Sequence, residues 1–108
     1  MLDWSAVPSE EVYPGVTRQT IQGARSTVVR YVYQPGAVFP EHAHPEEQTT
    51  VVLSGRITFF AEGRAIGLAA GQSLLVPPGQ PHSARVEGDE VVESINVLAP
   101  RRERGPGG

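Results

Sequence analysis

The chain contains three histidines, and two of them, His42 and His44, are separated by a single residue. Side chains two residues apart on an extended segment face the same side, so both imidazoles can point at one spot. His82 begins a later β-rich segment, and Gln48 follows His44 by four residues, beyond the Pro45 turn. Imidazole is the commonest protein ligand for zinc, copper, iron and nickel, and an amide oxygen can add a fourth donor. The pattern predicts a site for one divalent metal ion, with positions left open for water or a substrate.

Short β-rich segments between glycine and proline turns must carry these side chains. Such segments, spaced by about eight to twelve residues, are typical of an all-β sandwich or barrel. Because side chains alternate along a strand, we expect Thr50 and Val52 to face inward with Gln48, and Glu47 to point away. We expect no helix longer than a turn or two, and strands at residues 26–33, 48–53, 56–61, 64–68, 73–76, 82–86 and 90–98.

The length and composition limit the classes of protein that this chain can be. Its 108 residues suit one compact domain, and we expect that domain at residues 1–100, with a basic, Gly/Pro-rich flexible tail at residues 101–108. The absence of cysteine excludes disulfides, Cys-ligated zinc, iron–sulfur clusters and thiol catalysis. All nine basic residues are arginine, and three of them lie in the tail, which leaves an acidic body. We therefore expect neither nucleic acid nor an anionic membrane surface as a partner.

Hydropathy and the N-terminal sequence bear on location. The chain has no apolar run of the roughly eighteen residues that a membrane span needs. It also does not begin with a basic segment followed by an apolar one, as a secretory signal would. We expect a cytoplasmic protein.

The spacing of these residues resembles the first sequence motif of the cupin superfamily. That motif is a Gly, five residues, HxH, three or four residues, an acid, six residues and a Gly. This chain has Gly36, then His42 and His44, then Gln48 in the position of the acid, and Gly55.

The second cupin motif is also matched. Gly71, Pro77, Gly79 and His82 stand at the expected spacings, while Val86 replaces the usual Asn. The resemblance implies a single-domain antiparallel β-barrel of jelly-roll order, also described as a double-stranded β-helix. It also implies a homodimer, a small-molecule ligand or substrate in the barrel, and one metal ion (Zn, Ni, Mn or Fe) held by His42, His44, Gln48 and His82.

The stretch HAHPEEQ, with Gln48 in the metal position, is similar to a group of small cupins that includes pectin-degradation proteins. Those proteins convert unsaturated monouronates to linear keto forms. The resemblance implies an acid on the last strand, followed two residues later by an aromatic, but this chain has Asn96 and Leu98 there. An Asn cannot act as a general acid or base, although it can orient a substrate oxygen or a water. Tyr31 and Tyr33 share one strand face, and a tyrosine phenol near a metal can exchange a proton, so Asn96 and Tyr33 are the candidate catalytic residues.

Three functions remain open at this point. The first is a metal-dependent isomerase or tautomerase, lyase or cyclase that acts on a small carbonyl, enol or carboxylated molecule. The second is an iron-dependent dioxygenase, which would consume dioxygen. The third is a non-catalytic barrel that binds a small ligand.

Overall fold

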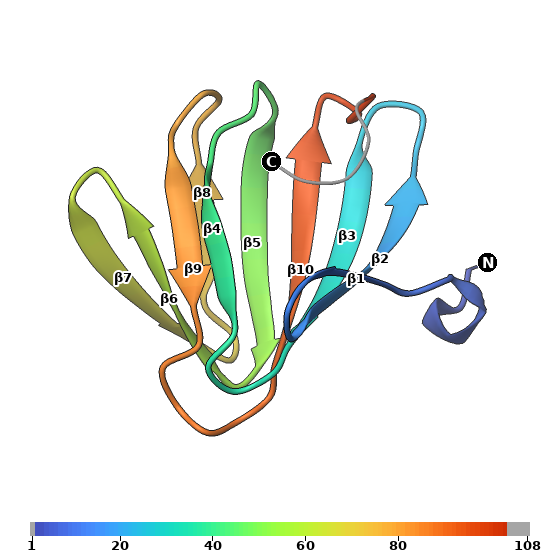
Figure 1. Cartoon of the computed structure of the whole chain (residues 1–108). Coiled ribbons are helices and arrows are strands. Elements are labelled where there is room, and N and C mark those ends of the chain that lie inside the picture. Colours follow the sequence, from blue (N-terminus) through green and yellow to red (C-terminus); the bar gives the residue numbers. More distant parts are fainter. Residues whose placement is uncertain (1, 104–108) are drawn as a thin grey trace.

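A computed structural model describes residues 2–103, which form ten strands and one short 3-10 helix (Figure 1). The elements are η1 (Trp4–Ala6), β1 (Glu10–Tyr13), β2 (Val16–Gln22), β3 (Thr27–Tyr33), β4 (Val38–His42), β5 (Glu47–Ser54), β6 (Arg56–Ala61), β7 (Arg64–Ala69), β8 (Ser73–Val76), β9 (His82–Arg85) and β10 (Val92–Ala99). All strand pairs are antiparallel, in sheets of order β1-β2-β3-β10-β5-β8 and β4-β9-β6-β7. This arrangement confirms the expected all-β, single-domain jelly-roll fold.

Three strands, β1, β2 and β4, were not predicted from the sequence. Strand β2 is polar, but it pairs with β3 over seven residues, and the buried β3 stabilises it. Strand β4 contains Pro40, which cannot donate a backbone hydrogen bond to a ladder. It is tolerated because β4 is an edge strand with only β9 as its neighbour. Propensity alone could not reveal these strands, because their stability comes from pairing and position.

The inward faces of the two sheets divide into an apolar part and a polar part. Alternate residues of β3, β5 and β10 are buried, as strand periodicity requires. Aliphatic and aromatic residues fill the apolar part: Val16, Val29, Val52, Ile57, Phe59, Val86 and Val92. Thr50 and Val52 do face inward with Gln48, and Glu47 is exposed. Three of the buried polar residues of β5 and β10, Gln48, Thr50 and Asn96, are joined by side-chain hydrogen bonds.

Two glycines of the motifs have positive φ angles that position the ends of these strands. Gly55, at φ +78, turns the chain from β5 to β6, and a Cβ there would lie 2.6 Å from the Val91 carbonyl oxygen. Gly79, at φ +76, donates its backbone N–H to the His44 carbonyl oxygen at 2.8 Å. This bond joins the turn before β9 to the loop after β4, and so connects the two sequence motifs that carry the histidines.

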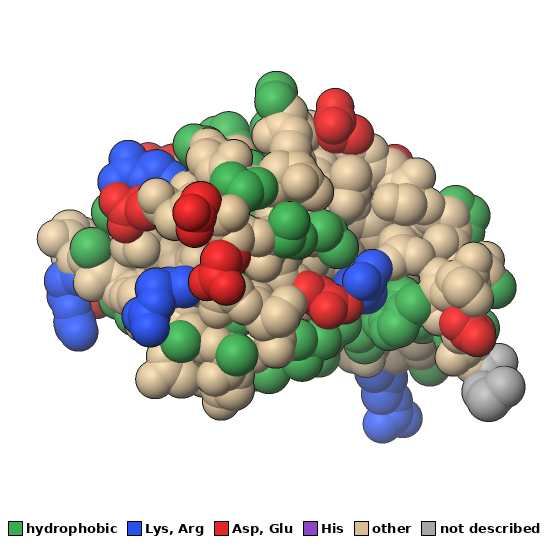
Figure 2. Space-filling model, turned by 90° about the horizontal axis from the view of Figure 1, so that it is seen from below, with side chains coloured by type: hydrophobic (Ala, Val, Ile, Leu, Met, Phe, Trp, Pro, Cys, Tyr) green, Lys and Arg blue, Asp and Glu red, His purple; other side chains and the backbone are tan. Residues whose placement is uncertain are grey.

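The molecular surface carries mixed charge. On the face shown in Figure 2, acidic and arginine side chains alternate with apolar ones, and neither sign forms a continuous stripe. This face offers no basic footprint of the kind that nucleic acids require. Within residues 2–103, no helix is long and apolar enough to cross a membrane.

Candidate metal centre

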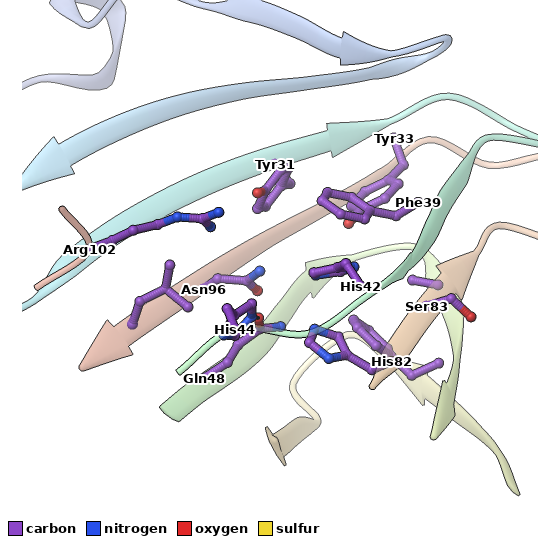
Figure 3. Close-up of a pocket in the computed structure, with 13 residues that line it drawn as sticks. Tyr31, Tyr33, Phe39, His42, His44, Gln48, His82, Ser83, Asn96 and Arg102 are labelled. Carbon is purple, nitrogen blue, oxygen red and sulfur yellow. Dashed lines mark hydrogen bonds between the residues drawn. The ribbon is translucent and has the colours of Figure 1, made fainter. Parts of the chain in front are cut away.

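The three histidines converge although they come from different elements. His42 ends β4, His44 lies in the loop that follows, and His82 begins β9, where it is the register partner of His42. The imidazole centroids of His42 and His82 are 4.1 Å apart, and that of His44 lies 5.5 Å and 5.1 Å from them. The sequence placed His42 and His44 on one extended segment, whereas the strand ends at His42. The loop still turns both rings to the same place (Figure 3).

Backbone carbonyl groups select the same tautomer in all three rings. The Nδ1 atom of His42 lies 2.9 Å from the Pro40 oxygen, that of His82 lies 2.9 Å from the Gln80 oxygen, and that of His44 lies 3.0 Å from the Glu46 oxygen. A carbonyl only accepts, so each Nδ1 carries the proton and each Nε2 presents a lone pair. This is the outer contact that orients metal-binding histidines and fixes their tautomer.

The arrangement fits a metal ion. One candidate ligand nitrogen from each histidine lies within 4.8 Å of the other two. The His82 Nε2 atom is buried and has no hydrogen-bond partner among the described residues, which is an unfavourable state for a lone pair unless a cation occupies the site. Ligand atoms about 2.1 Å from one zinc ion are at most about 4.2 Å apart. A small inward movement of the rings therefore suffices to bind an ion.

Gln48 presents its oxygen to this cluster. Its Nε2 donates to Thr50 Oγ1 at 2.9 Å, and the Thr50 hydroxyl donates to Asn96 Oδ1 at 2.8 Å. This relay turns the Gln48 Oε1 atom toward His44, whose Nε2 lies 3.0 Å away. Sequence periodicity placed Thr50 on the inner face, but its role as the link that orients Gln48 becomes visible only in the structure.

A buried carboxylate that the sequence reading did not single out lies beside the cluster. Glu46 is buried, and its Oε1 atom is 3.6 Å from His44 Nδ1. Glu46 places a carboxyl group on the outer side of the His44 ring, and strand alternation could not reveal it because Glu46 precedes β5.

The electrostatics keep the His42 and His82 imidazoles neutral and ready to bind a cation. Burial, together with the neighbouring His82, His44 and Arg102, lowers the pKa of His42 to about 4, against the hydrogen bond to the Pro40 carbonyl. Burial also lowers the pKa of His82, with His44 acting in the same direction. Both rings are therefore unprotonated near pH 7, as a metal ligand must be.

The histidines face a small cavity, which also has apolar and aromatic walls. Both candidate catalytic residues line it: Asn96 through a buried amide on β10, and Tyr33 through β3. Burial and the nearby Tyr31 raise the pKa of Tyr33 far above its usual value. Leu98, in place of an aromatic, contributes an apolar wall.

Arg102 is a cavity residue that the sequence reading assigned to the flexible tail. The described part of that segment, residues 101–103, instead packs back onto the sheet. The Arg102 N–H donates to Thr27 Oγ1 at 2.8 Å, and its carbonyl accepts from Gln22 Nε2 at 3.0 Å. Its buried side chain lines the cavity (Figure 3). Composition alone indicated a solvated end, and only the register of β10 places Arg102 over the cavity; residues 104–108 lie outside the described part of the chain.

An antiparallel two-sheet barrel with three convergent imidazoles inside it defines a class of metal-binding β-barrel proteins. Consistent with this, the profile of the cupin domain family matches residues 29–98. The chain belongs to the cupin family.

Solved structures and one curated relative are also similar to this chain. An RmlC-like cupin from Shewanella frigidimarina superimposes with a TM-score of 0.86, at 26% identity over 95% of this chain and 92% of that one. KdgF from Halomonas sp. gives a TM-score of 0.81 at 24% identity, over 89% and 88% of the two chains, and supports the fold alone. The dimethylsulfoniopropionate lyase DddQ of Ruegeria pomeroyi is 38% identical over 56 residues, which are 50% of this chain. The match spans only 28% of that lyase.

Proposed function

We propose that this cupin is a metal-dependent enzyme of the isomerase, tautomerase, lyase or cyclase type, acting on a small carboxylated carbonyl or enol compound. The observation that carries the proposal is that one cavity is lined both by imidazoles that can bind a metal and by a guanidinium that can bind an anion. Three imidazoles with fixed tautomers present Nε2 lone pairs, and the Arg102 guanidinium lines the same space. Such a cavity can hold an oxygen ligand at one end and an anion at the other.

In this proposal His42, His44, His82 and Gln48 hold one divalent ion, which would act as a Lewis acid and favour the enolate form of a bound carbonyl compound. Arg102 pairs with the carboxylate of the substrate, because its planar guanidinium matches that group. The Asn96 Oδ1 atom is occupied by Thr50, so the amide offers its Nδ2 donors to a substrate oxygen or a water. The apolar walls from Phe39, Phe59 and Leu98 limit the entry of water.

Proton–deuteron exchange next to a carbonyl is the most general test of this proposal. Pyruvate incubated in D₂O with the metal-loaded chain should lose its methyl proton signal in NMR spectra, and His82→Ala should abolish the effect. Ala84→Gly offers a cavity-lining control that removes no polar group and should retain exchange. Binding of pyruvate without exchange would favour the non-catalytic barrel. Oxygen consumption by the Fe²⁺-loaded chain, measured in a parallel arm, would favour the dioxygenase.

The homodimer also stays a proposal. Leu75 is 60% exposed on the edge strand β8, and Leu53 is 48% exposed on the adjacent strand β5. Burying such side chains against a second copy would remove apolar surface from water. Light scattering of the wild type and of Leu75→Glu tests this: the wild type should have the mass of two chains and the variant that of one. A wild-type mass of one chain would refute the dimer.

A further inference from the structure

Three polar side chains form a row across the six-stranded sheet, from its open edge to the cavity. Glu10 on β1 is the register partner of Arg18 on β2, and Arg18 is the register partner of Tyr31 on β3. Arg18 Nε donates to Glu10 Oε1 at 2.9 Å, and the Arg18 side chain lies beside that of Tyr31, close enough to oppose the rise in the Tyr31 pKa. Tyr31 lines the cavity, so the row ends in the space that the histidines face.

The row fixes the direction of the Tyr31 hydroxyl proton. A guanidinium has donors and no acceptor, so toward Arg18 the Tyr31 phenol oxygen can act only as an acceptor. The hydroxyl proton must then point away from Arg18. Only 7% of the Arg18 side chain is exposed. A buried charge destabilises the fold unless an opposite charge pairs with it. Glu10 pairs with it and holds the guanidinium against Tyr31.

The Arg102 guanidinium lies on the same side of the cavity as Tyr31. Figure 3 shows the Arg102 side chain extended toward Tyr31, with the three histidines on the other side. Burial raises the pKa of Tyr31, while Arg18 from β2 and Arg102 from the C-terminal segment oppose that rise. The remaining group that acts on it is Tyr13 from β1, which raises its pKa further. The phenol is therefore protonated at neutral pH and can serve as a donor.

The other two tyrosines lack this setting. Tyr33 lines the cavity, but its ring packs on that of Tyr31 at a centroid distance of 5.9 Å, and no arginine contributes to its pKa shift. Tyr13 packs edge-on against Phe39 at 4.9 Å and is not among the cavity-lining residues. The three tyrosine hydroxyl groups therefore lie in three different environments. Phenylalanine variants at the three positions can be compared directly.

We propose that the Tyr31 hydroxyl donates a hydrogen bond to the substrate's carboxylate, which it shares with Arg102, and that Arg18 and Glu10 are positioning residues for that hydroxyl. This inference rests on the proposed function, because it requires the substrate to carry a carboxylate. It assigns the substrate-facing role to Tyr31 and leaves Tyr33 as a wall. The two donors together select a planar anion over a neutral ligand of the same size.

Titration of pyruvate into the zinc-loaded full chain tests the proposal by calorimetry and by the near-ultraviolet difference spectrum of tyrosine. Loss of one hydrogen bond to a charged group should weaken binding in Tyr31→Phe about tenfold or more, and should remove the difference signal. Tyr13→Phe should keep both, because Tyr13 is not among the cavity-lining residues, and Tyr33→Phe is the comparison for the other cavity tyrosine. Arg18→Gln should alter the difference signal, and Arg18→Lys should restore part of it. The zinc content should stay the same in all five variants.

The outcomes separate this inference from the proposed function. Wild-type affinity in Tyr31→Phe, or a signal that disappears in Tyr33→Phe instead, would overturn the role of Tyr31. Failure of the wild type to bind pyruvate would overturn the carboxylate site as a whole. If Tyr31→Phe loses binding while the wild type shows no proton exchange in D₂O, the Tyr31 contact stands and the enzyme proposal fails.

Discussion

The Nε2 atom of His44 lies 3.0 Å from the Oε1 atom of Gln48, and both atoms are acceptors. The Nδ1 proton of His44 is directed to the Glu46 carbonyl, and the Gln48 amide nitrogen is directed to Thr50. Two acceptors in contact repel each other unless a proton or a cation lies between them. Ligand atoms about 2.1 Å from one ion and at right angles are about 3.0 Å apart. The local hydrogen bonds therefore hold these two groups in the spacing that a metal ion needs.

Metal binding should stabilise the fold. Addition of Zn²⁺ or Ni²⁺ at about one hundred times its dissociation constant should add about 2.7 kcal/mol to the free energy of unfolding. For a chain of this size that corresponds to a rise in Tm of roughly 10 to 20 °C. Differential scanning fluorimetry measures the rise, and His44→Ala should abolish it. An equal rise in His44→Ala would show that the ion binds elsewhere.

The charge of residue 48 should tune metal affinity. Gln48→Glu adds a negative ligand and should tighten Zn²⁺ binding by about tenfold or more, because a charge-assisted contact gains about 1.5 kcal/mol or more. Gln48→Leu removes the ligand oxygen and should weaken binding by a similar factor. Competition against a chromophoric chelator gives both constants. Equal affinity in all three proteins would remove Gln48 from the ligand set.

The metal-free protein should lose stability as the pH falls from about 6.5 toward 4. The pKa of His42 is lowered to about 4, and that of His82 is lowered as well, so the unfolded chain binds protons in this window that the folded chain does not. Urea denaturation at several pH values should therefore show a falling midpoint. The double variant His42→Gln/His82→Gln should flatten this dependence, leaving only the contribution of the carboxylates. A wild-type midpoint that does not change across this window would contradict the burial of neutral imidazoles.

Gly55→Ala should destabilise the fold strongly. The added Cβ would lie 2.6 Å from the Val91 carbonyl oxygen, and backbone atoms cannot move aside cheaply. We expect a loss of about 2 to 4 kcal/mol. Gly63→Ala is the matched control, because Gly63 also has a positive φ but has open space around its Cα. Chemical denaturation of the two variants should differ by the cost of the clash, and equal losses would contradict it.

The fold and the histidine cluster could be predicted because their signals are local and periodic. Alternation along 48–53 placed Gln48, Thr50 and Val52 on one face, and the structure agrees. The spacing of His42, His44 and His82 to the motif glycines resembles that of the cupin motifs, and this resemblance implied that the three rings meet at one metal site. Turns of that kind can be predicted because glycine and proline, which favour them, are visible in the sequence.

The missed features depend on long-range pairing. Arg102 follows a strand and lies in a run of charged residues, so its composition indicates solvent, yet bonds to Gln22 and Thr27 some eighty residues away place it over the cavity. Arg18 and Tyr31 are brought together by the register of β2 and β3, and β2 itself carries little strand signal. Such partners become apparent only once the strand order is known.

The metal content of the purified chain tests the central claim most directly. Elemental analysis of the wild type should find about one zinc, nickel, manganese or iron ion per chain, bound either as purified or after incubation and desalting. The double variant His42→Ala/His82→Ala, which removes the two register partners of β4 and β9, should bind none while keeping its β-sheet circular dichroism. A wild-type chain that retains no metal after incubation with each of these ions would contradict the account.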